Sequence, residues 1–368
     1  MRFNKTNKEQ ADHQIPIMIE DTVQCLKFFP SKNINYFASG GWDCKVRIFE
    51  VKYEIVGTSG NNNVVNISSN QMNLCQHKAP ILSLSWFGQQ GTLFSGCIDG
   101  SINYIDCQKN ILTKIGEHKY GCREVIFLDK FNLLLSGGYD GMVKLWDLRS
   151  NQAPITNFQF NNKIYTMSYA KNLLVVGLSE NLLSYFNLGN FQKSKFQPEL
   201  IYNSHMNAQI KKVAVLKDGD GYIEGSSIGR VAVKYIDFNN PGFDYQNNEI
   251  KCEKDYSFRC HKELKDNAIN SYIINDIAVN PEYGTICTAE GNGLYKIWDI
   301  EKRAGLYDRK NFTDKTPLTA CEYNLNGDLL AYASGYDWSK GAQVAHLYSK
   351  PKIFLHYLQP EHRKKIEL

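Results

Sequence analysis

One eleven-residue pattern returns along most of this chain. It reads SGGWDCKVRIF at 39–49, SGCIDGSINYI at 95–105, SGGYDGMVKLW at 136–146, VGLSENLLSYF at 176–186 and TAEGNGLYKIW at 288–298. A degraded copy, EGSSIGRVAVK, lies at 224–234, and a truncated copy, ASGYD, lies at 333–337. Each copy ends one strand in small residues, usually turns on an acidic residue or Asn, and begins a second strand. Such a repeat determines the architecture before any single residue is interpreted.

The spacing of the copies indicates the kind of repeat. The turn residues are Asp43, Asp99, Asp140, Glu180, Ile228, Asn292 and Asp337, and successive turns are separated by 56, 41, 40, 48, 64 and 45 residues. Blades of a β-propeller repeat every ~40–45 residues and place extra length in loops. The two long gaps contain the polar stretches Thr58–Gln76 and Asn239–Ile273. We expect both stretches to be surface loops.

The periodicity within a unit is that of strands. Ile81–Phe87, Asn132–Ser136 and Met142–Asp147 are short apolar or alternating runs, and no long helical period is present. The dipeptides Asp99-Gly100, Asp140-Gly141 and Asn292-Gly293 supply the positive φ that two-residue hairpin turns need. The sequence therefore predicts an all-β chain, a seven-bladed β-propeller, in which short radial sheets leave few exposed edges.

We expect a single domain over residues 1–368. Its blades are predicted at about 20–57, 77–113, 118–155, 160–200, 205–240, 261–310 and 313–358. Closing such a ring requires the two ends of the chain to share a blade. A closing strand is therefore expected within 10–19, where the apolar run Ile15–Ile19 supplies the outer strand of the seventh blade.

Composition excludes several classes of protein. The net charge of +4 and the pI of about 8.4 are too weakly basic to indicate nucleic-acid binding by themselves. The ten cysteines include no CxxC pair, so neither a zinc site nor any other metal or cofactor is expected, and free thiols fit the cytosol or nucleus. No stretch has the form of a secretory signal or the length of a membrane span.

Two readings exist for the polar residues that recur inside the units. His118, Ser136 and Asp140 have the composition of a hydrolase triad. However, His77 and Asp99 repeat the same 22-residue spacing, and catalytic triads do not recur blade after blade. The pattern resembles the buried hydrogen-bonded chain of WD-repeat blades, which ends on a Trp such as Trp146 or Trp298. We therefore predict a structural network and no enzyme.

Other motifs for chemistry are incomplete. Asp218-Gly219-Asp220-Gly221 begins like a calcium loop, but its twelfth position is Gly229 in place of the bidentate Glu. No nucleotide-binding P-loop is present. We therefore expect neither a small-molecule substrate nor a cofactor.

Four residues remain as candidates for contacts with a partner: Trp42, Arg230, Arg259 and Lys262. Trp42 follows two glycines at a turn, where it either packs on its own blade or binds a partner, because Trp is enriched in binding hot spots. Arg230 follows a turn glycine and is either a solvated charge or a fork for a partner carboxylate.

The end of the chain carries a more specific pattern. Pro317–Cys321 leads to Leu330–Gly341, which reads LAYASGYDWSKG, and this stretch closely resembles the signature of the nuclear-pore mRNA-export propeller family. Gly229–Ile236 and the run Phe258–Lys262 are also similar to that family and to its sister, the spindle-checkpoint propellers. The similarity extends over about residues 15–357, and it is specific in units five to seven.

The resemblance implies a propeller that binds the GLEBS segment of an FG nucleoporin. In that family, acidic side chains of the segment meet basic residues on one propeller face, beside an aromatic residue of the first blade. Carried across by motif, these residues are Arg230, Arg259 and Trp42, with Lys262 as a further contact. The chain departs from the family at Ile228, which replaces an acidic turn residue, and at 342–348.

The expected function is accordingly a non-enzymatic adaptor that supports mRNA export at the nuclear pore, in the nucleus with cytoplasmic shuttling. An FG nucleoporin is the implied partner, mRNA or ribonucleoprotein is a further one, and no membrane insertion is expected. The alternatives are a checkpoint propeller that binds GLEBS-like segments of kinetochore proteins, and a generic WD-repeat scaffold.

Overall fold

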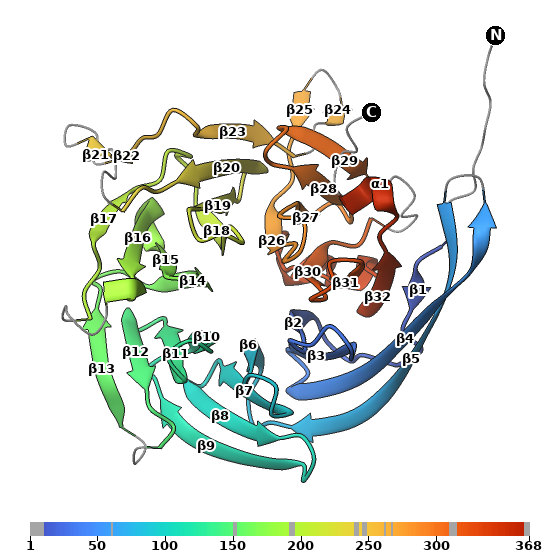
Figure 1. Cartoon of the computed structure of the whole chain (residues 1–368), viewed down its shortest axis with the longest axis horizontal. Helices are drawn as coiled ribbons and strands as arrows, with labels where there is room; N and C mark the ends of the chain where they lie inside the picture. The colour runs from blue at the N-terminus through green and yellow to red at the C-terminus, as the bar shows by residue number, and fades with distance from the viewer. Residues whose placement is uncertain are drawn as a thin grey trace.

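A computed structural model describes residues 11–59, 62–149, 153–190, 196–238, 243–244, 249–260, 263–265, 268–308 and 315–363. Seven four-stranded antiparallel sheets stand radially around a central channel, as Figure 1 shows. The seven-bladed β-propeller predicted from the repeat is therefore confirmed. In the described part of the chain, no helix has the length and apolar character needed to cross a membrane.

Each blade runs outward from the channel through four strands. Blade 1 contains β2 (Val23–Phe28), β3 (Tyr36–Gly41), β4 (Lys45–Ser59) and β5 (Asn62–Gln76). Blade 2 contains β6 (Ile81–Trp86), β7 (Thr92–Cys97), β8 (Ser101–Asp106) and β9 (Ile111–Glu117). Blade 3 contains β10 (Cys122–Leu128), β11 (Leu133–Gly138), β12 (Met142–Trp146) and β13 (Pro154–Gln159). Blade 4 contains β14 (Ile164–Ala170), β15 (Leu173–Leu178), β16 (Leu182–Asn187) and β17 (Leu200–Asn203).

The remaining blades follow the same plan. Blade 5 contains β18 (Ile210–Val215), β19 (Gly221–Ser226), β20 (Arg230–Tyr235) and β23 (Tyr256–Arg259). Blade 6 contains β26 (Ile274–Val279), β27 (Ile286–Glu290), β28 (Tyr295–Asp299) and β29 (Ala304–Asp308). Blade 7 contains β30 (Leu318–Tyr323), β31 (Leu329–Ser334), β32 (Lys352–Tyr357) and β1 (His13–Gln14).

Short elements connect these sheets. Two small hairpins pair β21 (Phe243–Asp244) with β22 (Glu249–Ile250), and β24 (Glu263–Lys265) with β25 (Ala268–Asn270). Helical turns lie at η1 (Ser179–Asn181), η2 (Leu188–Asn190), η3 (Ala342–Leu347) and α1 (Pro360–Arg363). The turn glycines behave as their Asx-Gly context predicts: Gly100, Gly141 and Gly293 have φ of 89°, 76° and 84°.

The inner strands are joined from blade to blade by side chains. An inner strand pairs with a neighbour in its own sheet on one side only. The main-chain N–H groups on its other edge face the preceding blade and need acceptors. Oxygen atoms of that blade's inner strand supply them. The pairs of acceptor side chain and donor residue are Ser83 with Val125, Ser85 with Phe127, Thr166 with Val213, Ser168 with Val215, and Asp276 with Cys321, at 2.8–3.2 Å.

The ring closes through the N-terminal strand, close to the predicted place. β1 pairs antiparallel with β32, with His13 opposite Leu355 and Gln14 opposite Phe354, and the Ile15 N–H donates to the Ile353 carbonyl at 2.9 Å. The pairing thus begins two residues before the predicted run at 15–19. Ile15 and Ile19 are buried in the core that joins blades 7 and 1.

The expectation of a surface loop at Thr58–Gln76 is wrong. These residues continue a 15-residue β4 into a 15-residue β5, and the two strands form a hairpin much longer than any other (Figure 1). The inner face of the hairpin packs on the rest of the protein, because Val51 and Val65 are buried there. The Tyr53 hydroxyl also donates to Asp328 of blade 7 at 2.6 Å.

The second insert is also more than a loop. β23 lies within the stretch Asn239–Ile273 and pairs with β20, which completes blade 5. The outer strand of blade 5 therefore lies beyond the predicted end of that blade at 240, and the first strand of blade 6 begins at Ile274. Because the insert is polar, the sequence pattern did not predict this four-residue strand. Its inward residues, Tyr256 and Phe258, pack on blade 6.

We predict that Ile19→Ala destabilises the ring closure strongly, whereas Met18→Ala does not. Ile19 is 2% exposed and Met18 is 73% exposed, so the two changes remove similar volumes from opposite environments. Loss of the buried side chain should lower the free energy of unfolding by about 2–4 kcal/mol, and the exposed change should stay within about 0.5 kcal/mol. Urea unfolding measures both, and equal effects would contradict the closure described above.

Candidate protein-binding face

One face of the disc carries all the recurrent turns. In every blade the inner strand has a register shift near its first residues, and the residue left unpaired there points toward the channel. All seven line a cavity of about 480 Å³ at the mouth of the channel: Gln24, Leu82, Arg123, Tyr165, Lys211, Asn275 and Thr319. We call this cavity the channel mouth, and the side of the disc on which it opens the turn face.

Trp42 lies at this mouth. Its main-chain N–H donates to the Thr22 carbonyl at 2.9 Å, and its indole N–H donates to Gln24 Oε1 at 3.3 Å, yet the side chain remains 38% exposed. Trp338 of blade 7 lines the same cavity and is 48% exposed. The two indoles thus present apolar surface at the junction of blades 7 and 1.

Sequence reasoning did not single out Trp338 as a site residue, although it quoted the segment that contains it. Trp338 has φ of 60°, a left-handed conformation that non-glycine residues rarely adopt. Its neighbour Tyr336 stacks on Tyr348 with centroids 4.5 Å apart, and the Tyr336 carbonyl accepts from the Thr22 hydroxyl at 2.9 Å. The seventh-unit signature therefore builds one wall of the mouth.

Two cations reach the mouth, Lys211 from β18 of blade 5 and Arg123 from β10 of blade 3. Lys211 makes no hydrogen bond or ion pair within the described part of the chain. Burial lowers the pKa of its ammonium group, the positive charge of Arg123 lowers it further, and Asp337 opposes both effects. Arg123 donates weakly to the Leu82 carbonyl at 3.4 Å and lies 3.5 Å from Glu124. An anionic side chain entering here would find one cation that is already desolvated.

Arg230 and Arg259 stand directly opposite each other in blade 5, in the pairing of β20 with β23. Like charges at opposed positions are destabilising. Arg230 donates to Ser257 Oγ at 3.4 Å, and its buried Nε atom has no hydrogen-bond partner. Across the described ranges, neither guanidinium has a carboxylate partner. The pair therefore forms a cationic site near the turn face that lacks an anion.

The structure separates the four predicted contact residues. Arg230 and Arg259 are adjacent, Trp42 lies at the channel mouth of blade 1, and Lys262 lies outside the described residues. Arg230 follows the β19–β20 turn and Trp42 lies in the β3–β4 turn, which are equivalent turns on the same face. The fold thus brings three of the predicted residues to one face.

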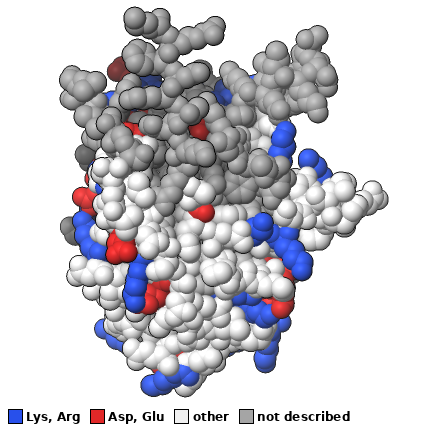
Figure 2. All heavy atoms as spheres, turned by 90° about the vertical axis from the view of Figure 1, so that its right-hand side faces the viewer, with Lys and Arg blue, Asp and Glu red and all other residues white. Residues whose placement is uncertain are grey.

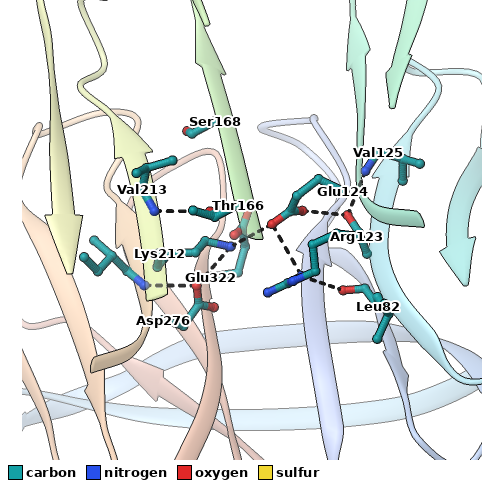
Figure 3. A network of polar contacts seen from close by, with 12 residues as sticks. Leu82, Arg123, Glu124, Val125, Thr166, Ser168, Lys212, Val213, Asp276 and Glu322 are labelled. Carbon is teal, nitrogen blue, oxygen red and sulfur yellow. Dashed lines mark hydrogen bonds and ion pairs between the residues drawn. The ribbon is translucent and has the colours of Figure 1, made fainter. Parts of the chain in front are cut away.

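Below the mouth, the channel contains paired charges. Figure 3 shows Glu124 from blade 3 and Lys212 from blade 5 meeting across the channel, with their charged atoms 3.8 Å apart. Lys212 also lies 3.2 Å from Asp276, and Lys27 lies 2.8 Å from Glu322, which joins blades 1 and 7. These charges neutralise one another, so the channel interior holds the blades in register.

The triad-like residues lie inside blade 3. His118 Nε2 is 2.8 Å from Ser136 Oγ, and His118 Nδ1 is 3.0 Å from Asp140 Oδ1. The Trp146 indole N–H donates to the same Ser136 oxygen at 2.8 Å. Ser136 is completely buried, so a substrate has no access to its hydroxyl. The arrangement links the turn to β11, to β12 and to the segment that precedes β10.

The copies of this network differ between blades. In blade 2, His77 Nε2 lies 2.9 Å from Ser95 Oγ, but Asp99 accepts its hydrogen bonds from Ser101 and not from His77. In blade 6, the Trp298 indole N–H donates to Thr288 Oγ1 at 3.1 Å. In each of these blades, the Ser or Thr on the second strand is thus the residue that bonds the His, the Trp or both.

Blade 6 contains a buried carboxyl group at the end of β27, close enough to Cys260 to affect its thiol. Glu290 is 1% exposed, and neither of its carboxylate oxygens has a hydrogen-bond partner. Burial raises the pKa of Glu290 to about 8, Asp308 adds to the effect, and Lys296 opposes it. Burial and then Glu290 also raise the pKa of the Cys260 thiol, next to Arg259. No group of three or more His, Cys, Asp or Glu side chains is placed to hold a metal ion among the described residues.

We predict that Glu290→Gln stabilises the protein at neutral and alkaline pH. The folded pKa lies above the ordinary value of 4.5, so the stability of the wild type is greatest below pH 4.5 and falls as pH rises through about 8. Gln keeps the neutral shape, and the gain at pH 8 should be roughly 2–3 kcal/mol. Chemical unfolding at pH 5 and pH 8 measures the difference, and an equal effect at both values would contradict it.

Comparison with known proteins agrees with the fold. The family description "WD domain, G-beta repeat" matches residues 14–50, 68–106 and 109–147. A poly(A)+ RNA export protein of Schizosaccharomyces pombe is 30% identical over 96% of this chain and 92% of its own length. The mRNA export factor rae-1 of Caenorhabditis elegans is 28% identical over 88% of this chain and 82% of its own length.

Mitotic checkpoint protein bub3 of Dictyostelium discoideum is 27% identical over 95% of each chain. Both groups are thus similar to this chain along almost all of its length, and the highest of these identities is to an export protein. With seven blades and the seventh-blade signature described, the chain belongs to the WD-repeat mRNA-export propeller family, whose sister group is the checkpoint propellers.

Proposed function

We propose that this chain is a non-enzymatic adaptor of mRNA export at the nuclear pore. Its turn face captures the acidic GLEBS segment of an FG nucleoporin. The observation that carries the proposal is the opposed pair Arg230 and Arg259, two cations that lack a carboxylate partner in the described structure. The names of its relatives support the export role, since two of them are export proteins.

The chemistry of the turn face matches an acidic segment with apolar neighbours. Arg230 and Arg259 offer guanidinium forks, which bind carboxylates in a bidentate and oriented way. Lys211 and Arg123 add positive charge at the channel mouth, where Trp42 and Trp338 are exposed. A segment that contacts both the arginine pair and Trp42 crosses the face, so charges would orient it and the indoles would contribute apolar area.

The polar residues that resemble catalytic groups have structural roles, and this supports a non-enzymatic function. The strongest candidate for a nucleophile, Ser136, is buried and bonded to both His118 and Trp146. The charges of the channel are paired with one another. In this proposal the molecule acts through binding, in the nucleus and at the pore with cytoplasmic shuttling.

We predict that Arg230→Glu and Arg259→Glu each weaken binding of a GLEBS peptide by roughly 10- to 100-fold, because each replaces an attraction with a repulsion. Isothermal titration at low and high salt measures the affinity. Arg149→Glu is the matched control, since Arg149 is exposed, pairs with Asp147 and follows β12 at the opposite end of its strand from the turn face. Full binding by both folded variants would refute the role of this pair.

The checkpoint reading remains the alternative, because a checkpoint protein is nearly as similar. A fluorescent fusion distinguishes the two in dividing cells. Our proposal expects label at the nuclear rim in interphase, whereas label at kinetochores without a rim signal would favour the checkpoint function.

A second surface favours contact with single-stranded RNA. Along blades 5 and 6, Phe258 and Trp298 have ring centroids 4.5 Å apart, and the Arg303 guanidinium lies 4.4 Å from the centre of the Tyr256 ring. Lys296 lies 4.8 Å from the Trp298 ring. The Phe258 and Trp298 rings pack on each other, so the exposed Arg303 beside Tyr256 is the group proposed to contact bases and phosphates.

We predict that Arg303→Ala weakens binding of an unstructured RNA oligonucleotide by about 5- to 30-fold, because it removes an exposed cation beside the Tyr256 ring. Fluorescence anisotropy measures the affinity, and Arg303→Ala should also make it less sensitive to salt. Arg149→Ala serves as the control. RNA binding that is insensitive to salt in the wild type would count against this surface.

A further inference from the structure

The outer strand of blade 1 differs from every other outer strand described. β5 has 15 residues, whereas the outer strands β9, β13, β17, β23, β29 and β1 have seven or fewer. At the rise of an extended chain, β5 is about 50 Å long. Its sequence, NNVVNISSNQMNLCQ, contains no Lys, Arg, Asp, Glu or Pro. Natural sheets normally protect an exposed edge with such residues or by shortening the strand.

The inner face of the β4–β5 hairpin is already occupied. Tyr53 packs against Tyr357 of β32 with the rings tilted and their centroids 5.6 Å apart, and His13 Nε2 of β1 lies 2.9 Å from Ser69 Oγ. The hairpin thus lies across the outer side of blade 7, where it reinforces the ring closure. Its opposite face is exposed, including Met72 at 54% and Leu74 at 40%. On the side of the disc that carries the hairpin, the described atoms are mostly those of uncharged residues, with scattered residues of both signs (Figure 2).

The free edge of β5 can be located from its hydrogen bonds. The Asn63 N–H and carbonyl bond the Gln359 side chain at 2.8 and 2.9 Å, so the main chain of Asn63 points away from β4. Main-chain groups alternate in direction along a strand. Those of Ile67, Ser69 and Gln71 therefore point outward as well, and within the described structure none of them has a main-chain partner on that side.

We propose that this edge pairs with the same edge of a second copy of the chain. The two β5 strands run antiparallel about a two-fold axis beside Ser69. Ser69 then faces Ser69 of the second copy, and Ile67 faces Gln71 of the second copy. Each of these residues exchanges its two outward main-chain hydrogen bonds. On the exposed face, Ser68 meets Asn70, and both are small polar side chains.

The absence of charge identifies a second copy as the occupant. In a two-fold antiparallel pair each strand faces itself, so any charge near the axis meets a like charge. β5 avoids this repulsion along its whole length, whereas β9 carries Lys114 and Glu117. A charged partner strand would find no complementary charge on β5. A two-fold pair also covers both edges at once and ends the assembly at a dimer.

The interface is small, so the dimer should be weak. It comprises the main-chain bonds of about three residues from each copy, which is below the size of a stable interface. We expect a dissociation constant on the order of 10–100 µM. Dimerisation leaves the turn face free, because β5 lies at the perimeter of the disc (Figure 1).

Sedimentation velocity of the full chain, from about 2 to 200 µM, tests the proposal. Ser69→Pro removes the central outward N–H without removing a bond to β4, and Ser68→Lys places like charges beside the axis. Each change should raise the dissociation constant at least tenfold. Asn157→Lys, at an exposed position of the outer strand β13, is the matched control and should behave as the wild type.

Thermal melts show whether each variant is folded. If Ser69→Pro is not folded, Ser68→Lys decides the question, because its side chain is exposed. A wild type that stays monomeric at the highest concentration would overturn the proposal. The same conclusion would follow from unchanged dimerisation in the folded variants, or from open-ended assemblies in place of a dimer.

Discussion

The ring depends on satisfying the free edges of its inner strands. Each inner strand has one neighbour in its own sheet. Without acceptors from the adjacent blade, the main-chain N–H groups on its other edge would be buried without hydrogen bonds. Ser83, Thr166 and Asp276 accept those hydrogen bonds from the next blade. Seven blades can therefore lie close around a narrow channel. The same requirement explains why short polar side chains occur in strands that are otherwise apolar.

Closure adds a constraint that the other junctions lack. Blades 1 and 7 are joined by the short β1, by the buried Ile15 and Ile19, and by the Lys27–Glu322 ion pair. The long hairpin of blade 1 reinforces this junction from outside through Tyr53. The junction of blades 7 and 1 is thus held by contacts in the channel, within the sheet and at the perimeter.

The function proposed for the turn face follows from the same geometry. A register shift in each inner strand directs one side chain into the channel mouth, so the ring that stabilises the disc also creates the cavity. Deeper charges such as Glu124 and Lys212 neutralise each other. The opposed Arg230 and Arg259 have no such arrangement, and in the proposed function an acidic partner relieves their repulsion. The charges that stabilise the ring are therefore not the charges that we propose to bind a partner.

Local sequence patterns determined the all-β fold, the seven units and the turns, because Asx-Gly pairs and alternation act within a few residues. They also pointed to His118, Ser136 and Trp146 as a network. They failed at Thr58–Gln76, because a polar strand orders only when its inner face packs on blade 7. The opposition of Arg230 to Arg259, and the role of Trp338 at the mouth, were decided by tertiary structure alone. Strand pairing and ring closure bring together residues whose separation in sequence carries no signal of contact.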